Sequence, residues 1–352
     1  MALYEPSIGI LETYVTWNDV EKMMQKKFET KAKFGEDKNA TNISEMKGYM
    51  SIIALINADW VDVEKGKNVP SKFAVYGLKK FIDENDMKGF LIVDFVSNAH
   101  DVGMYLSIPA DELIPLVRGI STFSALGEKL SDNEKKFAGG SDFLERMFSQ
   151  LFNSSSLQKH FQGMYSVFEK EKYYQVDGLI ETFVVYQKLL KKYTKISELL
   201  GFKSVLNHGD LWQSNMIHSM ENNGKLKLEA IIDWQSTVIL PPGLDTAELI
   251  VGCLSAEDRR EKGHDLLLLY HKTFINVFGS EVFSFEELQD SYNLYFPMAA
   301  ILIVPGMISF MTNTQITEAE RIHSMSKITA IVEDTLKIHK QNLKRFPDFM
   351  QI

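Results

Sequence analysis

The hydrophobic and polar positions of the chain follow one pattern near its start and another in the rest. Short apolar runs separated by polar turns predict strands at residues 41–46, 49–56, 72–76 and 91–96. A helix from Thr16 to about residue 33 is predicted before them, with Thr16 as its N-cap. From Asp111 onward, apolar residues recur every three or four positions, which indicates helices. The pattern therefore predicts a small α+β region followed by a larger, mostly helical one.

The helical region contains one strongly apolar stretch, residues 296–311. Pro305-Gly306 interrupts it, and it is too short to cross a bilayer. We interpret this stretch as a pair of buried helices and expect no membrane span. Small residues at Gly139-Gly140-Ser141 and at Ser154-Ser155-Ser156 predict loops, and the last helix is predicted from Glu318 to about residue 340.

A hairpin is predicted inside this helical region. Met216-Ile217-His218 is a short apolar run, residues 226–232 alternate, and Asn222-Asn223-Gly224 between them tolerates positive φ. An antiparallel pairing about Gly224 would set Asn215 opposite Asp233, where paired residues lie about 4.5–5.5 Å apart. The two side chains would then be close enough to share one metal ion.

The chemistry of these residues points to phosphoryl transfer. Asp210 and Asn215 have the D-x-x-x-x-N spacing of a kinase catalytic loop, in which the Asp accepts a proton and the Asn binds Mg²⁺. Asn215 and Asp233 offer hard oxygen ligands, which suit Mg²⁺ bound to phosphates. A lone D-x-x-x-x-N is common by chance, and His-Gly-Asp is often only a turn. The combination with the hairpin and Ile-Ile-Asp-Trp favours a site.

HGDLWQSNM at residues 208–216 and IIDWQ at 231–235 resemble the aminoglycoside phosphotransferase and choline kinase superfamily. The resemblance is strongest to its CHK kinase-like branch, which includes ecdysteroid kinases, and extends from about Tyr4 to the C-terminus. It implies a protein-kinase-like two-lobe fold, with residues 1–96 as a small nucleotide-binding lobe and 97–352 as a larger helical lobe. It also implies ATP bound between the lobes, Mg²⁺, and a small-molecule hydroxyl as acceptor.

The resemblance implies further roles. The hairpin containing Gly48 would cover the phosphates, although it also reads as an ordinary hairpin, and Asp94-Phe95-Val96 would be a hinge whose backbone meets the adenine edge. Asp245 would hydrogen-bond the catalytic loop or, equally, cap the helix that follows it. Apart from the resemblance, we expect His208 to be structural, with its ring packed beneath the loop.

The chain departs from the family pattern at one place. Kinase-like folds need a lysine on the third strand and a later helix whose glutamate holds it. Here Phe73-Ala74-Val75 is followed directly by Tyr76, and Lys79 and Lys80 stand before an acidic turn. The small lobe therefore looks shortened by a segment. We predict that the chain binds ATP weakly and turns over slowly or not at all.

Composition narrows the classes of partner and compartment. The 352 residues carry a formal charge of −9, which argues against nucleic acid as the main partner. The single cysteine, Cys253, excludes an intrachain disulfide and a multi-cysteine zinc site. The first residues lack a basic segment and an apolar core, so no secretory signal is expected and a cytoplasmic location is predicted.

Two other functional classes stay open. A catalytically impaired pseudokinase that binds a ligand or partner would keep the same fold, and only turnover would distinguish it. A metal-dependent hydrolase using His208, Asp210 and Asp233 fits the two-lobe layout poorly. The acceptor is not readable from the sequence: a lipid head group, a steroid, an amino sugar and a xenobiotic alcohol are all open.

Overall fold

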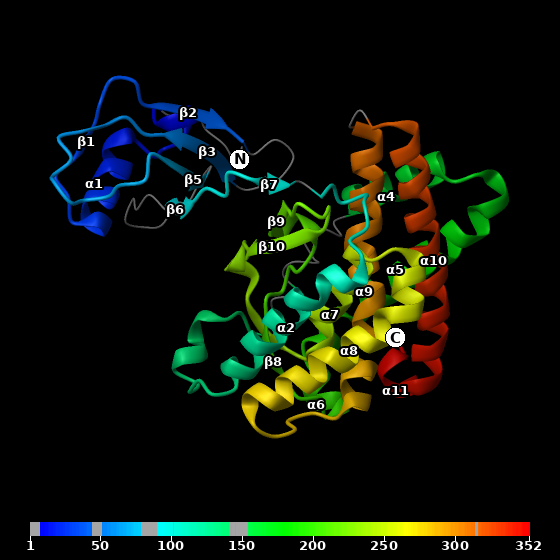
Figure 1. The fold of residues 1–352 in the computed structure, drawn as a ribbon. Coiled ribbons are helices and arrows are strands. Elements are labelled where there is room, and N and C mark those ends of the chain that lie inside the picture. Colours follow the sequence, from blue (N-terminus) through cyan, green and yellow to red (C-terminus); the bar gives the residue numbers. More distant parts are fainter. Residues whose placement is uncertain are drawn as a thin grey trace. The chain divides into compact units, whose positions relative to one another are not determined.

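The computed structural model describes residues 8–43, 51–78, 90–100, 102–140, 142, 145, 154–313 and 316–352 (Figure 1). The chain divides into two compact units, Met1–Ser97 and Asn98–Ile352. The first contains a small sheet and the second is mainly helical, and this content confirms the predicted fold class. Gly48, Lys79 and Lys80 lie outside the described residues.

The first unit is built on a four-stranded antiparallel sheet. Its strands are ordered β2 (Asn39–Asn42), β3 (Ser51–Asn57), β5 (Lys72–Leu78) and β6 (Phe90–Asp94), and β1 (Lys33–Phe34) pairs separately with β4 (Trp60–Val61). A 3₁₀ turn η1 (Ile10–Glu12) and helix α1 (Trp17–Phe28) precede it. Thr16 and Asp19 form a capping box at the start of α1. The helix ends earlier than predicted because Glu29 takes a left-handed φ of 49°.

One face of this sheet is buried against α1. Phe73 and Val75 of β5 form a core cluster with Val20 and Met24 of the helix. Successive side chains of a strand point to opposite faces. Ala74 therefore lies on the other face, together with Lys72 and Tyr76.

The second unit packs its helices around two apolar clusters. One cluster is formed mainly by α4 (Ser154–Val167), α5 (Tyr173–Tyr193), α7 (Gly243–Cys253), α9 (Phe285–Asn313) and α10 (Glu318–Arg345). The other lies mainly between α2 (Ala110–Gly127), α7 and α8 (Ala256–Phe278). Shorter elements are η2 (Glu134–Phe137), η3 (Lys170–Lys172), α6 (Ile196–Leu200) and α11 (Pro347–Met350). Figure 1 shows α9 and α10 side by side. Because α7 contributes to both clusters, it is fixed from two sides.

The prediction of a helix pair within residues 296–311 is wrong. α9 runs unbroken through Pro297 and Pro305. An internal proline costs a helix about 3 kcal/mol, but most of the surrounding residues are buried in the core and hold the helix together. Residues Phe285–Thr312 are long and apolar enough to cross a membrane, yet 78% of their most apolar window is buried within the protein, as in a core helix.

The strands of the second unit form two small antiparallel sheets. β8 (Val205–Asn207) pairs with β11 (Val238–Leu240). β9 (Met216–Met220) pairs with β10 (Leu226–Ile231) and with β7 (Ala99–His100). The β9–β10 pairing confirms the predicted hairpin. The open end of the hairpin and the end of β8 bring Asp210, Asn215 and Asp233 to one place.

Candidate functional site

The loop after β8 carries Asp210, and Gly209 sets its path. Gly209 has a φ of +81°, and a Cβ there would lie 2.2 Å from Ser236 O. Only glycine adopts this conformation without strain and allows so close an approach. The loop continues into the 3₁₀ turn η4 (Gln213–Asn215), which ends where β9 begins. The turn therefore places Asn215 at the base of the hairpin, and Asn215 follows Asp210 by five residues in the sequence.

The hairpin register differs from the predicted one. Next to the turn Leu226 pairs with Met220, so the ladder is centred on Asn223 rather than Gly224, and a β-bulge between Leu228 and Ala230 then shifts the pairing by one residue, so that Ile231 lies opposite Met216. Ile232 N then donates to Asn215 O at 2.9 Å. Asn215 is therefore opposite Ile232 rather than Asp233, and Asp233 follows as the first residue beyond the ladder.

Asp210 and Asn215 are joined directly. Asn215 Nδ2 donates to Asp210 O at 2.8 Å and to Asp210 Oδ2 at 2.9 Å. Because both bonds use the amide nitrogen, the amide oxygen Oδ1 is left without a hydrogen bond from the described residues. Burial raises the pKa of the Asp210 carboxyl, and the nearby charge of Asp233 raises it further. The pair thus presents a partly buried carboxylate as a base and an amide oxygen as a ligand.

Asp233 is held in an unusual conformation. Its φ is 66°, in the left-handed region that few residues other than glycine adopt. Its side chain is exposed at the surface, and its carboxylate has no hydrogen bond or ion pair among the described residues; the loss of part of its hydration raises its pKa. A carboxylate in such a position is stabilised by a cation. With the free oxygen of Asn215, it fits Mg²⁺, which usually takes one or two protein ligands plus phosphate oxygens and water.

His208 connects the loop to the residue before Asp233. Its side chain is fully buried, and its Nε2 lies 2.9 Å from Ile232 O. Its Nδ1 accepts from Asp210 N at 3.3 Å. Nε2–H then donates to the carbonyl while Nδ1 accepts, which fixes the tautomer. Trp234 packs edge-on against the ring at a centroid distance of 4.7 Å. Both nitrogens of His208 are therefore engaged in holding the Asp210 and Asp233 segments together.

Asp245 holds the loop rather than capping a helix. It lies inside α7, whose N-cap is Pro242. Its carboxylate accepts from His208 N at 2.7 Å and from Gly209 N at 2.9 Å. Of the two roles left open by the sequence, the structure shows the bond to the loop. Burial raises the pKa of Asp245.

Glu248 is a loop contact that the sequence reading missed. Its Oε2 accepts from Leu211 N at 2.7 Å, and burial raises its pKa well above the ordinary value. It stands three residues after Asp245, on the same side of α7. Every residue of this helix is buried. The sequence could have indicated this contact, because it places two acidic residues three positions apart in a mostly apolar helix. Buried acids need hydrogen-bond partners.

The residues proposed for the adenine contact lie in the first unit. Asp94 ends β6, where it pairs with Phe73, and Phe95 and Val96 follow the strand. Lys72 Nζ lies 4.6 Å from the centre of the Phe95 ring. Among the described residues, the structure thus brings together His208, Asp210, Asn215, Asp233 and Asp245 in the second unit, and places the hinge residues in the first.

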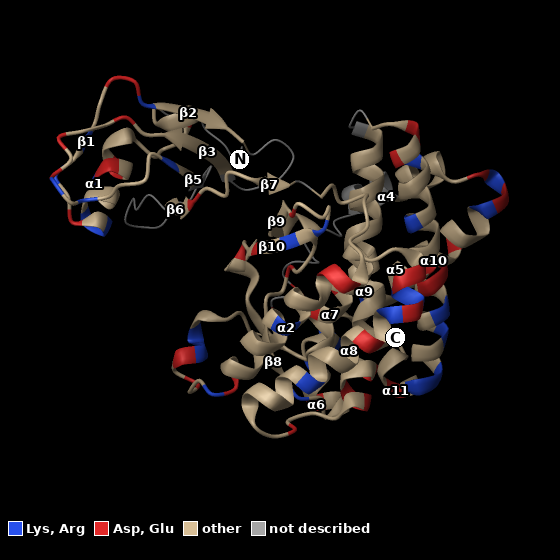
Figure 2. Ribbon diagram, viewed as in Figure 1, with Lys and Arg blue, Asp and Glu red and all other residues tan. Residues whose placement is uncertain are grey.

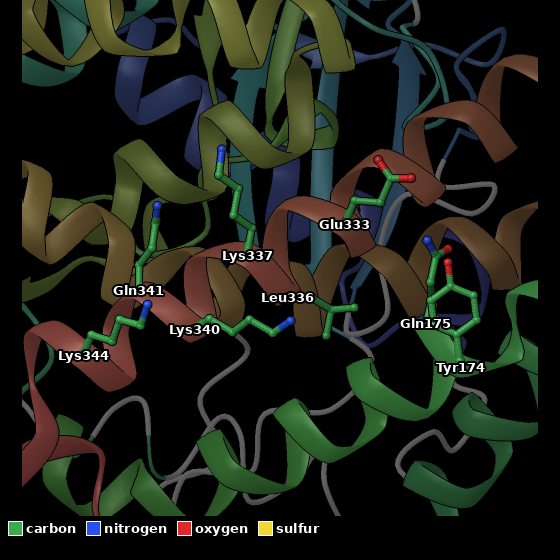
Figure 3. A pocket seen from close by; sticks show the side chains of 8 residues that line it. All are labelled: Tyr174, Gln175, Glu333, Leu336, Lys337, Lys340, Gln341 and Lys344. Atoms are coloured by element: carbon green, nitrogen blue, oxygen red, sulfur yellow. The ribbon is translucent and has the colours of Figure 1, made fainter.

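The described part of the second unit also has a groove that does not include these residues. It has a volume of about 440 Å³ and is lined by residues of α5 and α10 (Figure 3), namely Tyr174, Gln175, Glu333, Leu336, Lys337, Lys340, Gln341 and Lys344. Figure 2 shows Lys and Arg residues, in blue, along α10. The groove is not part of the candidate site. No group of three or more His, Cys, Asp or Glu in the described residues is arranged to hold a metal.

Comparison with known proteins adds a family. The family model DUF1679, described as "Uncharacterized oxidoreductase dhs-27", matches residues 3–75 and 74–343. A Caenorhabditis elegans protein described as "Uncharacterized kinase-like protein D1044.1" is 34% identical over 102 residues, or 29% of this chain and 26% of that protein. The match thus spans about a quarter of that relative's length.

Solved structures similar to this chain include small-molecule kinases. A microcompartment-associated aminopropanol kinase has a TM-score of 0.46 at 10% identity, covering 93% of this chain and 98% of that one. A putative aminoglycoside phosphotransferase of Ralstonia eutropha has 0.44 at 13%, covering 92% and 97%. A Plasmodium vivax ethanolamine kinase has 0.43 at 11%, covering 84% and 82%.

Proposed function

The chain belongs to the DUF1679 family, and we propose that it is an ATP- and Mg²⁺-dependent phosphotransferase acting on a hydroxyl of a small molecule. The kinase-like relative agrees with the resemblance to the CHK kinase-like branch seen in the motifs. The acceptor class and a cytoplasmic location remain predictions. None of the 21 glycines forms the G-x-G-x-x-G pattern of a dinucleotide-binding turn, so this motif gives no support to the oxidoreductase activity named in the family description.

What supports this function most directly is the bond between Asn215 and Asp210 beside the unpartnered carboxylate of Asp233. Asn215 Oδ1 and the Asp233 carboxylate would hold Mg²⁺, which when bound neutralises charge on the phosphate oxygens. Asp210 would orient the acceptor hydroxyl and take its proton as the oxygen attacks the γ-phosphorus of ATP, and the bond from that phosphorus to the bridging oxygen would break to release ADP. Its raised pKa makes it a stronger proton acceptor than an exposed aspartate.

A catalytically impaired member of the family is the second candidate, and the first unit supports it. Ala74 and Tyr76 lie on the same face of β5, opposite the buried Phe73 and Val75. A kinase-like fold places its phosphate-binding lysine two residues after such an alanine, and here that position holds an uncharged tyrosine. The family model also matches in two segments that meet at residues 74–75, where we infer the loss of a segment.

The two candidates separate by turnover. ATP consumption is measured with Mg²⁺ against a panel of amino alcohols, amino sugars and sterols, for the wild type and for Asp210→Asn. Consumption that depends on one acceptor and disappears in Asp210→Asn supports phosphotransfer. MgATP binding by calorimetry without consumption for any acceptor supports the impaired candidate. Consumption that is unchanged in Asp210→Asn contradicts the assignment of the base.

A further inference from the structure

Lys327 is a buried lysine in the middle of α10. Its side chain is 2% exposed, and Nζ donates to three oxygen atoms from three other parts of the second unit. These are Leu106 O at 2.7 Å, Gly252 O at 2.5 Å and Gln213 Oε1 at 3.3 Å. An ammonium group has three donors and no acceptor. The three oxygens therefore match its full donor capacity.

The three partners include the loop that carries the candidate metal ligand. Gln213 is the first residue of η4, the turn that ends at Asn215. Its Nε2 donates to Leu106 O at 3.0 Å and to Gly103 O at 3.3 Å. Leu106 O thus accepts from both Lys327 and Gln213. The lysine, the glutamine and the 103–106 segment form one closed hydrogen-bonded unit around the start of η4.

The third partner belongs to the helix that holds the loop from its other side. Gly252 is in the last turn of α7, where helix carbonyls lack partners and carry partial negative charge. A cation at this end satisfies one of those carbonyls and stabilises the helix. α7 supplies Asp245 and Glu248, which bind the backbone of residues 208–211. Lys327 therefore connects both supports of the loop.

Burial of this amine is costly. Loss of hydration lowers the pKa of Lys327 to about 7, and the nearby positive charge of Arg259 acts in the same direction. A methionine of similar length would fill the space without this cost. A buried amine is useful where directed hydrogen bonds are needed, and here all of them go to the supports of the loop.

We propose that Lys327 is a positioning residue that fixes η4, and with it Asn215, against α7 and the 103–106 segment. Its consequence for catalysis rests on the proposed function, in which Asn215 binds Mg²⁺. The anchoring of the loop is a property of the protein itself and is testable without any ligand.

The anchoring is tested with two variants and one control. Lys327→Met removes all three bonds of Lys327. Gln213→Leu removes the bond from Lys327 to the loop together with the two bonds that Gln213 Nε2 donates, and leaves Lys327 bound to Leu106 O and Gly252 O. Ile331→Val is the control, because it makes a small cavity in the core one turn along α10. Hydrogen exchange is followed in peptides covering residues 211–216 and in peptides from α10. We expect exchange of 211–216 to rise about tenfold in both variants, as for loss of about one hydrogen bond. No such rise is expected in Ile331→Val. If residues 211–216 exchange at the wild-type rate in all three variants, the proposal is overturned.

The link to the metal is tested by titrating Mg²⁺ at fixed ATP and measuring nucleotide binding by calorimetry. Both variants should require about five- to tenfold more Mg²⁺ for half-maximal binding, while Ile331→Val matches the wild type. Variants that loosen residues 211–216 yet keep the wild-type Mg²⁺ dependence would remove the link to Asn215. If the wild type itself shows no Mg²⁺-dependent binding, the proposed function fails, and the exchange data still decide whether Lys327 anchors the loop.

Discussion

Replacing Gly209 by alanine should disturb the loop of Asp210 more than any similar change at an open turn. The φ of Gly209 is +81°, which costs a residue with a side chain about 1–2 kcal/mol. The new Cβ would also lie 2.2 Å from Ser236 O, where contacts below 3.0 Å require a shift, so the backbone must move by about 0.8 Å. Forced overpacking of this kind costs about 1–3 kcal/mol. We therefore expect a total loss of about 2–5 kcal/mol in the free energy of unfolding.

Gly224 provides a matched control. It also has a φ of +81°, but a Cβ there meets nothing within 4 Å. Gly224→Ala therefore carries the conformational cost without the collision, about 1–2 kcal/mol. Both variants are compared with the wild type by urea unfolding. The excess loss in Gly209→Ala measures the collision, and equal losses in the two variants would refute the tight packing of the loop against Ser236.

If Gly209→Ala displaces the loop that carries Asp210, it should also lower catalytic activity. A shift of about 1 Å at a catalytic group lowers activity on the order of 100-fold. If the chain transfers phosphate, Gly209→Ala should show this loss under conditions in which it is still folded, and Gly224→Ala should not. Full activity in a folded Gly209→Ala protein would show that Asp210 is placed by other contacts.

Other changes test the remaining parts of the site. Asp210→Asn should abolish phosphotransfer yet keep MgATP binding, whereas Asp233→Ala should weaken Mg²⁺-dependent nucleotide binding itself. Calorimetry measures binding and a turnover assay measures transfer. The reverse pattern would mean that Asp233 is the base and Asp210 the metal ligand. Asp245→Asn replaces one of two buried acceptors by a donor and should cost about 2 kcal/mol in urea unfolding; an unchanged midpoint would show that the loop does not need this carboxylate. The lowered pKa of Lys327 means that the unfolded chain binds more protons above about pH 7, so the free energy of unfolding should rise by up to about 1.4 kcal/mol per pH unit between pH 7.5 and 9. Lys327→Met should lack this rise in the free energy of unfolding, and an equal slope in both proteins would contradict the lowered pKa of Lys327. The measurement is kept at or below pH 9 because burial raises the pKa of Cys253 from 9.0 to about 12, which lowers stability at higher pH.

The hairpin was predictable from the sequence, but its register was not read correctly. Turn residues around Gly224 and two apolar runs predicted the pairing, because these features act locally. The prediction centred the pairing on Gly224, whereas next to the turn Leu226 pairs with Met220, so the ladder is centred on Asn223. The alternation of Leu226 and Leu228 ends in the continuous run Ala230-Ile231-Ile232. This change of period coincides with the bulge, which sets Asn215 opposite Ile232 instead of Ile231 and so brings the pairing one residue closer to the predicted one.

The supports of the loop were less accessible than the loop itself. Asp210, Asn215 and Asp233 stand at characteristic spacings within one short stretch. Glu248 and Lys327 act from distant helices, and their partners are mostly backbone atoms, which leave no residue pattern in the sequence. In the same way, the continuity of α9 through its prolines is set by burial in the core, which overrides the local preference of proline.

The proposed base and metal ligands lie in the second unit, and the proposed phosphate-binding position lies in the first. This division predicts which step would be impaired in a weakly active chain. In the second unit, the loop around Asp210 is held by Asp245, Glu248 and His208 through hydrogen bonds of 2.7–3.3 Å. In the first unit, we propose that Tyr76 occupies the position of the lysine that reaches the α- and β-phosphates in kinase-like folds. Loss of one charge-assisted contact of about 1.5–3 kcal/mol weakens binding about 10- to 150-fold without altering the base or the metal ligands. An impaired chain should therefore show weak ATP affinity that still depends on Mg²⁺ and on Asp233, whereas a chain with micromolar affinity must obtain the missing positive charge from another residue.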